Sequence, residues 1–405
     1  MTETKTKTPE QTPPSLNINL FSVSSLECPY ENYKTIRDTA PVTYLSPDGI
    51  YALGRYTNVR QALTDWEKFS SSEGVALNDG MNFALKGTTL GSNPPEHGRL
   101  RSVLTRPLMP QSINQLRERM QGLAAELINN LAKKGQFDAV PDLARHLPLT
   151  VVSELVGLPE EGRQRMLDWA AAGFNCMGPS GNERVENGFP TIMEMGKYVS
   201  DPSLPDRLRP GSWSATLYEA VKSGELVEKE FQSVIAGYLT PSLDTTIFAI
   251  SNMIKLFAEN PEQWAKLRAE PALAARAINE ALRIESPLQY FSRLTTEEVN
   301  VDGFVIPANS RVLMMFASAN RDERKFQNPE TFDITRASTG GGGHLAFGTA
   351  HHMCAGRNLA LLEMRVLLDE MIKQFTSIRL ISEKRVINNM LRGYQNIVIE
   401  VDPAN

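Results

Sequence analysis

Cysteine is scarce in this chain of 405 residues, which contains only Cys28, Cys176 and Cys354. Three widely separated cysteines make an odd number, and this pattern argues against a disulfide framework and against an oxidising compartment. We therefore expect a protein of the reducing cytoplasm, in which each thiol is free to act as a nucleophile or a metal ligand.

Long apolar runs and concentrated positive charge are also missing. The sequence contains no run of about 18 apolar residues, the length needed to cross a membrane. The net charge is -5, and no basic cluster interleaved with aromatics suggests nucleic acid. The first residues, MTETKTKTPEQTPPS, lack the apolar core of a secretion signal, so we predict a disordered tail over residues 1–17.

The remaining residues carry the periodicities of a mainly helical protein. Apolar residues recur every three or four positions over residues 112–132 and again over residues 262–284, with a break at Pro271. The stretches TYLSPDGIYAL, NVDGFVIPANSRVLMMF and NIVIEVD alternate like strands, and GPSGNE and SDPSLPDRLRPGS read as loops. We predict one mainly α domain over residues 18–405, with small sheets.

Cys354 lies in FGTAHHMCAG, just before the helical stretch AGRNLALLEMRVLLDEM. The N–H groups and dipole at a helix start favour a thiolate. Ala355 and Gly356 are small enough for a flat ligand to approach the sulfur, and Phe347 could cover the same face. An isolated cysteine is more often a buried structural residue, but these neighbours favour a metal ligand or nucleophile.

The pattern F-G-x-x-x-H-x-C-x-G resembles the haem-binding loop of the cytochromes P-450. The resemblance implies that Cys354 is the axial thiolate ligand of haem b (iron protoporphyrin IX), framed by Phe347, Gly348 and Gly356. It also implies the cytochrome P-450 fold, a large helical domain with small peripheral β-sheets around a buried haem. Ala350 stands where the family usually has glycine.

EALRIESP places Glu280 and Arg283 one helical turn apart, and ANRDERKFQNPETFDITR contains Arg336. Alone, such spacing usually marks a surface ion pair worth less than about 1 kcal/mol. The resemblance implies instead a buried network of these three residues that holds the haem loop and is costly to break.

Two haem propionates require cations or donors around them. PPEHGRLR starts like a helix and places His97 and Arg101 on one face, Arg293 follows in SPLQYFSR, and His352 precedes the cysteine. Each alone could be an ordinary surface residue. Together, the resemblance implies that they contact the propionates, while His344 is a weaker candidate that braces the loop.

AGYLTPSLDTTIFAI contains mediocre helix formers and Pro241, which removes a backbone donor from the helix. A purely structural helix has little reason to carry PSLDTT. The resemblance implies that Thr245 orients water and the distal oxygen and that Asp244 relays protons from solvent. Pro241 and Ser242 replace the small residues that usually precede this pair.

The stretches SSEGVALND, FNCMGPSGNE and ESPLQ resemble most closely the bacterial members that oxidise para-methoxybenzoates. Alignment with them implies an apolar and aromatic substrate pocket of Leu77, Phe174, Met177, Leu243, Leu288 and Phe291. Some of these side chains could instead simply pack in the core.

The groups that would attract a benzoate carboxylate are replaced here by Glu73, Ala236 and Gly237. Because an unpaired carboxylate is costly to bury, we expect a small aromatic substrate without one, such as a phenol, methoxyphenol or alkylated arene. The expected reaction with O2 is hydroxylation or O-demethylation.

The resemblance implies electron delivery from NAD(P)H through a reductase and an iron-sulfur ferredoxin, with Arg101, Arg357 and Arg365 as docking contacts, and a monomer. Two alternatives stay open. One is oxidative phenol coupling within the same family, and the other is a haem-thiolate ligand sensor without turnover, against which the pair Asp244 and Thr245 argues.

Overall fold

The computed structural model describes residues 11–336 and 343–404. Its α-helices are α1 (Val23–Glu27), α2 (Tyr30–Thr39), α3 (Tyr56–Thr64), α4 (Asp79–Leu85), α5 (Glu96–Leu104), α6 (Pro110–Gln115), α7 (Arg117–Lys134), α8 (Ser153–Val156), α9 (Glu160–Cys176), α10 (Glu183–Val199), α11 (Leu204–Arg207), α12 (Trp213–Lys222), α13 (Glu228–Leu239), α14 (Asp244–Glu259), α15 (Pro261–Ala269), α16 (Ala274–Ile284), α17 (Phe316–Ala319) and α18 (Arg357–Gln374).

The strands are β1 (Ser15–Leu16), β2 (Thr43–Leu45), β3 (Ile50–Leu53), β4 (Phe69–Ser70), β5 (Gln136–Asp138), β6 (Phe291–Thr295), β7 (Val299–Val301), β8 (Phe304–Ile306), β9 (Arg311–Met314), β10 (Phe375–Arg385) and β11 (Tyr394–Pro403). They form a six-stranded mixed sheet in the order β1-β2-β3-β9-β6-β4, a three-stranded sheet in the order β10-β11-β5, and the hairpin β7-β8.

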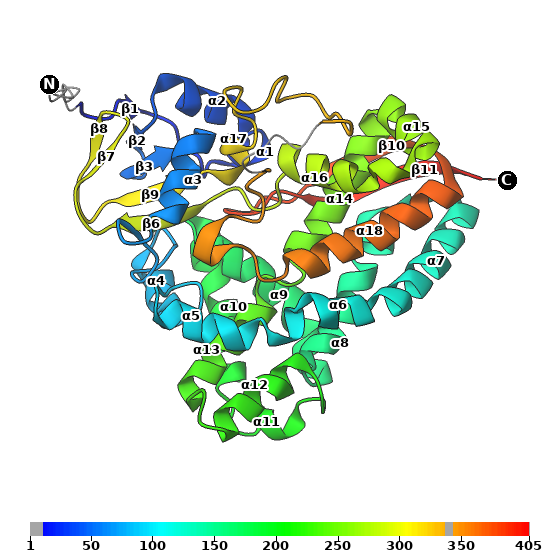
Figure 1. The fold of residues 1–405 in the computed structure, drawn as a ribbon, viewed down its shortest axis with the longest axis horizontal. Coiled ribbons are helices and arrows are strands. Elements are labelled where there is room, and N and C mark those ends of the chain that lie inside the picture. Colours follow the sequence, from blue (N-terminus) through cyan, green and yellow to red (C-terminus); the bar gives the residue numbers. More distant parts are fainter. Residues whose placement is uncertain (1–10, 337–342, 405) are drawn as a thin grey trace, which may run out of the picture.

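Helices make up most of the molecule, and the six-stranded sheet lies at one edge (Figure 1). Helix α14 runs through the interior and packs against α9, α16, α18 and both long strands β10 and β11. Most of its residues are apolar or small, and nearly all are buried, as expected for a helix with almost no solvent face. The cysteine loop precedes α18, which lies beside α7 and α16.

Most elements agree with the sequence predictions. The stretch at residues 112–132 divides at Leu116 into α6 and α7, and the stretch at residues 262–284 divides near Pro271 into α15 and α16. The prediction of a loop at SDPSLPDRLRPGS was wrong in part, because it contains the short helix α11.

The predicted disordered tail was also wrong over its last residues. Residues 1–10 lie outside the described part of the chain, but Ser15 and Leu16 pair in parallel with Tyr44 and Leu45. Strand pairing satisfies the backbone groups of this segment, a contribution that its polar composition does not reveal. Among the described residues, none of the helices has the length and apolarity needed to cross a bilayer.

Candidate active site

The cysteine loop comprises residues 343–356 and leads directly into α18. Its backbone closes on itself, since the N–H of Cys354 donates to the carbonyl of Phe347 at 2.8 Å. Gly348 and Ala350 adopt left-handed backbone angles, with φ of +65° and +55°. Glycine takes this conformation freely, whereas a side chain makes it unfavourable. Ala350, at the position where glycine was expected, therefore fits the loop with backbone strain.

The Cys354 side chain retains accessible surface although protein surrounds it. Burial raises the pKa of its thiol, while N–H groups of Gly356 and Arg357 and the charge of Arg101 act in the opposite direction. These donors would stabilise a thiolate once a metal ion replaces the thiol proton. The sulfur therefore lies amid protein atoms yet is open to a ligand.

Four side chains from three distant segments gather near this loop. His97 and Arg101 come from α5, Arg293 from β6 and His352 from the loop itself, and the rings of His97 and His352 lie 4.3 Å apart. The Nε2 atoms of both histidines are buried without a hydrogen-bond partner. Within the described residues, the guanidinium of Arg293 donates only to the carbonyl of Ser292, at 2.8 Å.

This group holds two arginine cations and two neutral imidazoles, and it is short of hydrogen-bond acceptors. Burial and neighbouring positive charges lower the pKa of His97 to about 4 and also lower the pKa of His352. Burial lowers the pKa of Arg293 to about 10. Among the described residues, no carboxylate forms an ion pair with these side chains, and buried cations require one. A dianionic ligand beside the thiol would supply the missing charge, and the two propionates of haem fit that requirement.

The predicted triad of Glu280, Arg283 and Arg336 is brought together in the structure. Arg283 donates two hydrogen bonds of 2.8 Å to the Glu280 carboxylate, and Nε of Arg336 adds contacts of 2.9 and 3.0 Å. Further donors of Arg283 reach the carbonyls of Asn320 and Pro329 at 2.8 Å each. The triad thus ties α16 to the stretch of residues 320–336 that lies before the cysteine loop.

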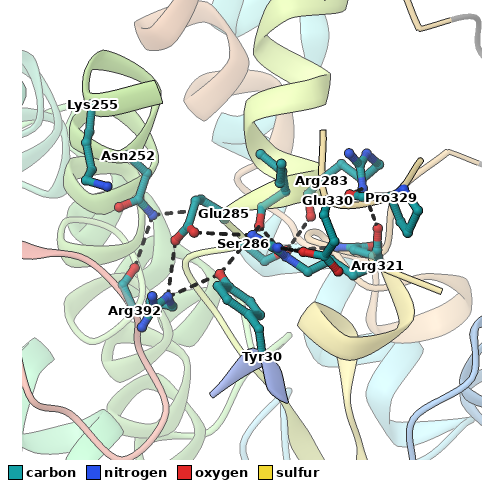
Figure 2. A network of polar contacts seen from close by, with 12 residues as sticks. Tyr30, Asn252, Lys255, Arg283, Glu285, Ser286, Arg321, Pro329, Glu330 and Arg392 are labelled. Carbon is teal, nitrogen blue, oxygen red and sulfur yellow. Dashed lines mark hydrogen bonds and ion pairs between the residues drawn. The ribbon is translucent and has the colours of Figure 1, made fainter. Parts of the chain in front are cut away.

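A second buried network adjoins the end of α16 (Figure 2). Arg392 donates to the Glu285 carboxylate at 3.2 Å and to the Tyr30 hydroxyl at 3.1 Å, while the guanidinium of Arg321 stacks 3.5 Å from the Tyr30 ring. Burial opposes ionisation of Glu285, but the surrounding arginines hold its pKa below the usual range. The sequence analysis did not predict this network, although Glu285 lies in the EALRIESP stretch and Arg321 lies in the ANRD stretch.

His344 braces the cysteine loop, as the sequence suggested. Its Nδ1 accepts from the N–H of Ala346 at 3.2 Å, so the proton belongs on Nε2, which lies 3.1 Å from the side-chain oxygen of Asn279. Burial and the charges of Arg357 and Arg283 lower the pKa of His344 to about 3. A neutral imidazole therefore joins the loop to α16.

The helix expected over residues 236–250 is interrupted around Pro241. Helix α13 ends at Leu239 and α14 begins at Asp244, with the residues between them outside any helix. The hydroxyl of Thr245 donates to the carbonyl of Pro241 at 2.9 Å, which leaves its lone pairs free to accept a proton donor. The hydroxyl of Ser242 is buried without a hydrogen-bond partner.

Asp244 opens α14 with an almost fully buried carboxyl group, which is 8% exposed. Burial raises its pKa to about 7, and the charge of Arg145 lowers the pKa less than burial raises it. A carboxyl group poised near neutral pH can both accept and release a proton, as a relay requires.

The six predicted pocket residues adjoin one core cluster. The N–H of Leu77 donates to the carbonyl of Met177 at 3.0 Å, which joins two segments a hundred residues apart. Phe174, Met177 and Leu243 are no more than 3% exposed, whereas Leu288 and Phe291 are partly exposed and pack against the same cluster. The structure therefore places the first three within the core.

Glu73, one of the residues at the positions where a benzoate carboxylate would be attracted, is exposed and lies next to a cation. Arg311 donates to the carbonyls of Glu73 and Gly74, and burial lowers the pKa of its guanidinium while the carboxylates of Asp79 and Glu73 raise it. Gly237 has room for a side chain, since a Cβ there would meet only Leu104, at 3.4 Å. The negative charge of Glu73 is thus partly offset, a feature that the sequence did not indicate.

The three predicted docking arginines all have partners within the chain. Arg101 donates to the carbonyl of Met353, Arg357 lies 5.9 Å from the Phe347 ring, and Arg365 donates to Asp369 at 2.8 Å. Arg365 also lines a cleft of about 340 Å³ between α6, α16 and α18, with a largely apolar floor.

Comparisons with known proteins agree with this geometry. Residues 212–392 match the sequence pattern of the family described as Cytochrome P450. The chain is 35% identical to cytochrome P450 CYP199A2 of Rhodopseudomonas palustris, over 96% of this chain and 95% of that protein. It is 30% identical to 6-deoxyerythronolide B hydroxylase of Saccharopolyspora erythraea, over 92% and 96% of the two chains. The solved structure of cytochrome P450 CYP109Q5 from Chondromyces apiculatus superposes with a TM-score of 0.79 at 29% identity, covering 96% and 98%. The chain belongs to the cytochrome P450 family of haem-dependent, oxygen-incorporating oxidoreductases.

Proposed function

We propose that this chain, as a single catalytic domain from residue 18 onward, is a monooxygenase for small aromatic substrates that lack a carboxylate. The observation that carries the proposal is the accessible thiol of Cys354 beside the buried guanidinium of Arg293 and two buried imidazoles whose Nε2 atoms have no hydrogen-bond partner. When bound, haem supplies the centre at which dioxygen is activated, with electron density pushed toward it by a thiolate ligand.

Each residue of the site has a defined part in this proposal. Cys354 would ligate the haem iron, and N–H groups at the start of α18 would stabilise the negative charge of its thiolate. Arg101, Arg293, His97 and His352 would bind the propionates, while Phe347, Gly348 and Gly356 would shape the loop beside the haem.

The interruption between α13 and α14 serves proton delivery in this proposal. Thr245 donates to the Pro241 carbonyl and can therefore accept a hydrogen bond from water at the oxygen site. Asp244, with a pKa near 7, passes protons inward from solvent. A ligand sensor without turnover needs no such relay, which supports the enzyme over that alternative.

The nature of the substrate is inferred from the six side chains that the resemblance assigns to the pocket, three of which lie within the core. Leu77, Phe174, Met177, Leu243, Leu288 and Phe291 offer apolar and aromatic contacts. Ala236 and Gly237 give α13 no hydrogen-bonding side chain at these two positions. A substrate carboxylate placed beside them would be desolvated without a partner. A phenol, methoxyphenol or alkylated arene fits this lining, with hydroxylation or O-demethylation as the reaction.

The direct test is a visible-absorption titration of the purified ferric protein with guaiacol and, separately, 4-methoxybenzoate. We expect guaiacol to convert low-spin haem to high-spin haem and the benzoate to have little effect. A response to the benzoate alone would contradict the neutral-substrate proposal and would direct attention to Arg311 as the anchor.

The reaction class needs a second measurement. With NAD(P)H, a ferredoxin reductase and an iron-sulfur ferredoxin, the product of guaiacol should gain oxygen or lose its methyl group. A product of twice the substrate mass, less two hydrogen atoms, would instead indicate oxidative phenol coupling.

A further inference from the structure

The thiol loop and the Glu280 triad both contact Asn320, a residue in the segment between them. Asn320 is completely buried and has no role in the site described above. Its side-chain oxygen accepts from the N–H of Leu345 at 2.6 Å, and its side-chain nitrogen donates to the hydroxyl of Ser286 at 2.8 Å. Its main-chain carbonyl accepts from Arg283 at 2.8 Å. Every polar atom of the side chain is therefore engaged.

The hydrogen bonds continue from Leu345 to the cysteine. The carbonyl of Leu345 accepts from the N–H of Gly348 at 2.8 Å, and the carbonyl of Phe347 accepts from the N–H of Cys354 at 2.8 Å. Leu345 itself is 2% exposed and belongs to a core cluster that also contains Leu53 and Val312. A displacement at the Leu345 N–H would therefore be transmitted into the turn that carries the thiol.

The far side of Asn320 is equally well anchored. Ser286 closely follows α16, and its hydroxyl donates to the carbonyl of Leu282 at 2.9 Å. Arg283, which holds the Asn320 carbonyl, is 2% exposed and fixed by the Glu280 carboxylate. Arg283 and Ser286 therefore form a fixed support, and Asn320 bonds both to this support and to the loop.

We propose that Asn320 is a positioning residue that ties the thiol loop to α16 and so holds Cys354 in place for metal ligation. The proposal rests on the proposed haem-thiolate function, because the position of the sulfur matters only if it binds iron. The inward-facing oxygen is the essential group, since it alone satisfies the buried Leu345 N–H.

The test compares Asn320→Ala with Asn320→Asp. Alanine removes the acceptor for Leu345, whereas aspartate keeps an oxygen there and lets the hydroxyl of Ser286 turn to donate toward it. Ser286→Ala is the matched control, because it removes the outer partner and leaves the bond to Leu345. The readouts are amide exchange at Leu345 and the absorption band of the ferrous-CO complex, which lies at long wavelength only with a thiolate ligand.

We expect Asn320→Ala to speed exchange at Leu345 by about tenfold or more, as the loss of a buried hydrogen bond allows, and to shift the CO band to shorter wavelength. Asn320→Asp and Ser286→Ala should keep most of the long-wavelength band. Unchanged exchange and an unchanged band in Asn320→Ala would overturn the proposal. If that variant does not fold, loss of the band in Asn320→Asp together with protected Leu345 would overturn it instead.

The two proposals fail in distinguishable ways. If the wild-type ferrous-CO complex lacks the long-wavelength band, the haem-thiolate function is wrong. The exchange of Leu345 in the same holoprotein preparation still reports whether Asn320 anchors the loop.

Discussion

Asp244 should cost stability in exchange for proton delivery, and Asp244→Asn should separate the two. The carboxyl group is 8% exposed, and burial raises its pKa from 3.8 to about 7. Below the unfolded pKa, both folded and unfolded states bind the proton. As the pH rises from 3.8 to about 7, the unfolded state loses its proton first, so the folded state becomes less stable relative to the unfolded state.

The magnitude follows from the shift. Taking 7 minus 3.8 gives about 3 pH units, and at about 1.4 kcal/mol for each unit the cost reaches roughly 4 kcal/mol at most above pH 7. An asparagine side chain carries no charge at any pH and avoids this cost. The Asp244→Asn protein should therefore be more stable than wild type, with a difference roughly 2–3 kcal/mol larger at pH 8 than at pH 5.

Urea unfolding of both proteins at pH 5 and pH 8, followed by circular dichroism, measures this difference. Asp206→Asn, at an exposed position on α11, is the control and should show no comparable change. The Asp244→Asn variant should still bind guaiacol but turn over more slowly, because the relay is lost. A stability difference that is independent of pH, or a variant less stable than wild type at pH 8, would refute the reasoning.

Three further predictions concern the loop, the triad and the cationic group. Ala350→Gly should stabilise the protein by about 1 kcal/mol in thermal unfolding, because glycine removes the strain at a φ of +55°, whereas Ala125→Gly within α7 should destabilise it by about as much. Glu280→Gln should cost about 3–5 kcal/mol of unfolding free energy, because it leaves Arg283 without its buried counter-charge. The control, Glu262→Gln on the exposed surface, should cost little. Equal losses in the two variants would refute the network argument. Arg293→Ala should speed haem transfer to apomyoglobin by roughly tenfold to a hundredfold, whereas exposed Arg379→Ala should not, and an unchanged rate would remove Arg293 from the propionate site.

Local features of the site were predictable because short-range geometry decides them. A helix places Glu280 and Arg283, three residues apart, on one face, and it likewise places His97 and Arg101, four residues apart, on one face of α5. The position of Cys354 before a helix likewise follows from the chain itself. The tail was mispredicted because pairing of Ser15 and Leu16 depends on a strand further along the sequence.

The sequence by itself determined the helices, the thiol at the start of α18 and the identity of the side chains available for haem. Only the tertiary structure decided which of them meet. Arg336 reaches Glu280 across 56 residues, the rings of His97 and His352 come within 4.3 Å, and Asn320 joins α16 to the cysteine loop. These contacts depend on how distant elements pack, and a buried polar group finds its partner only when that packing is complete.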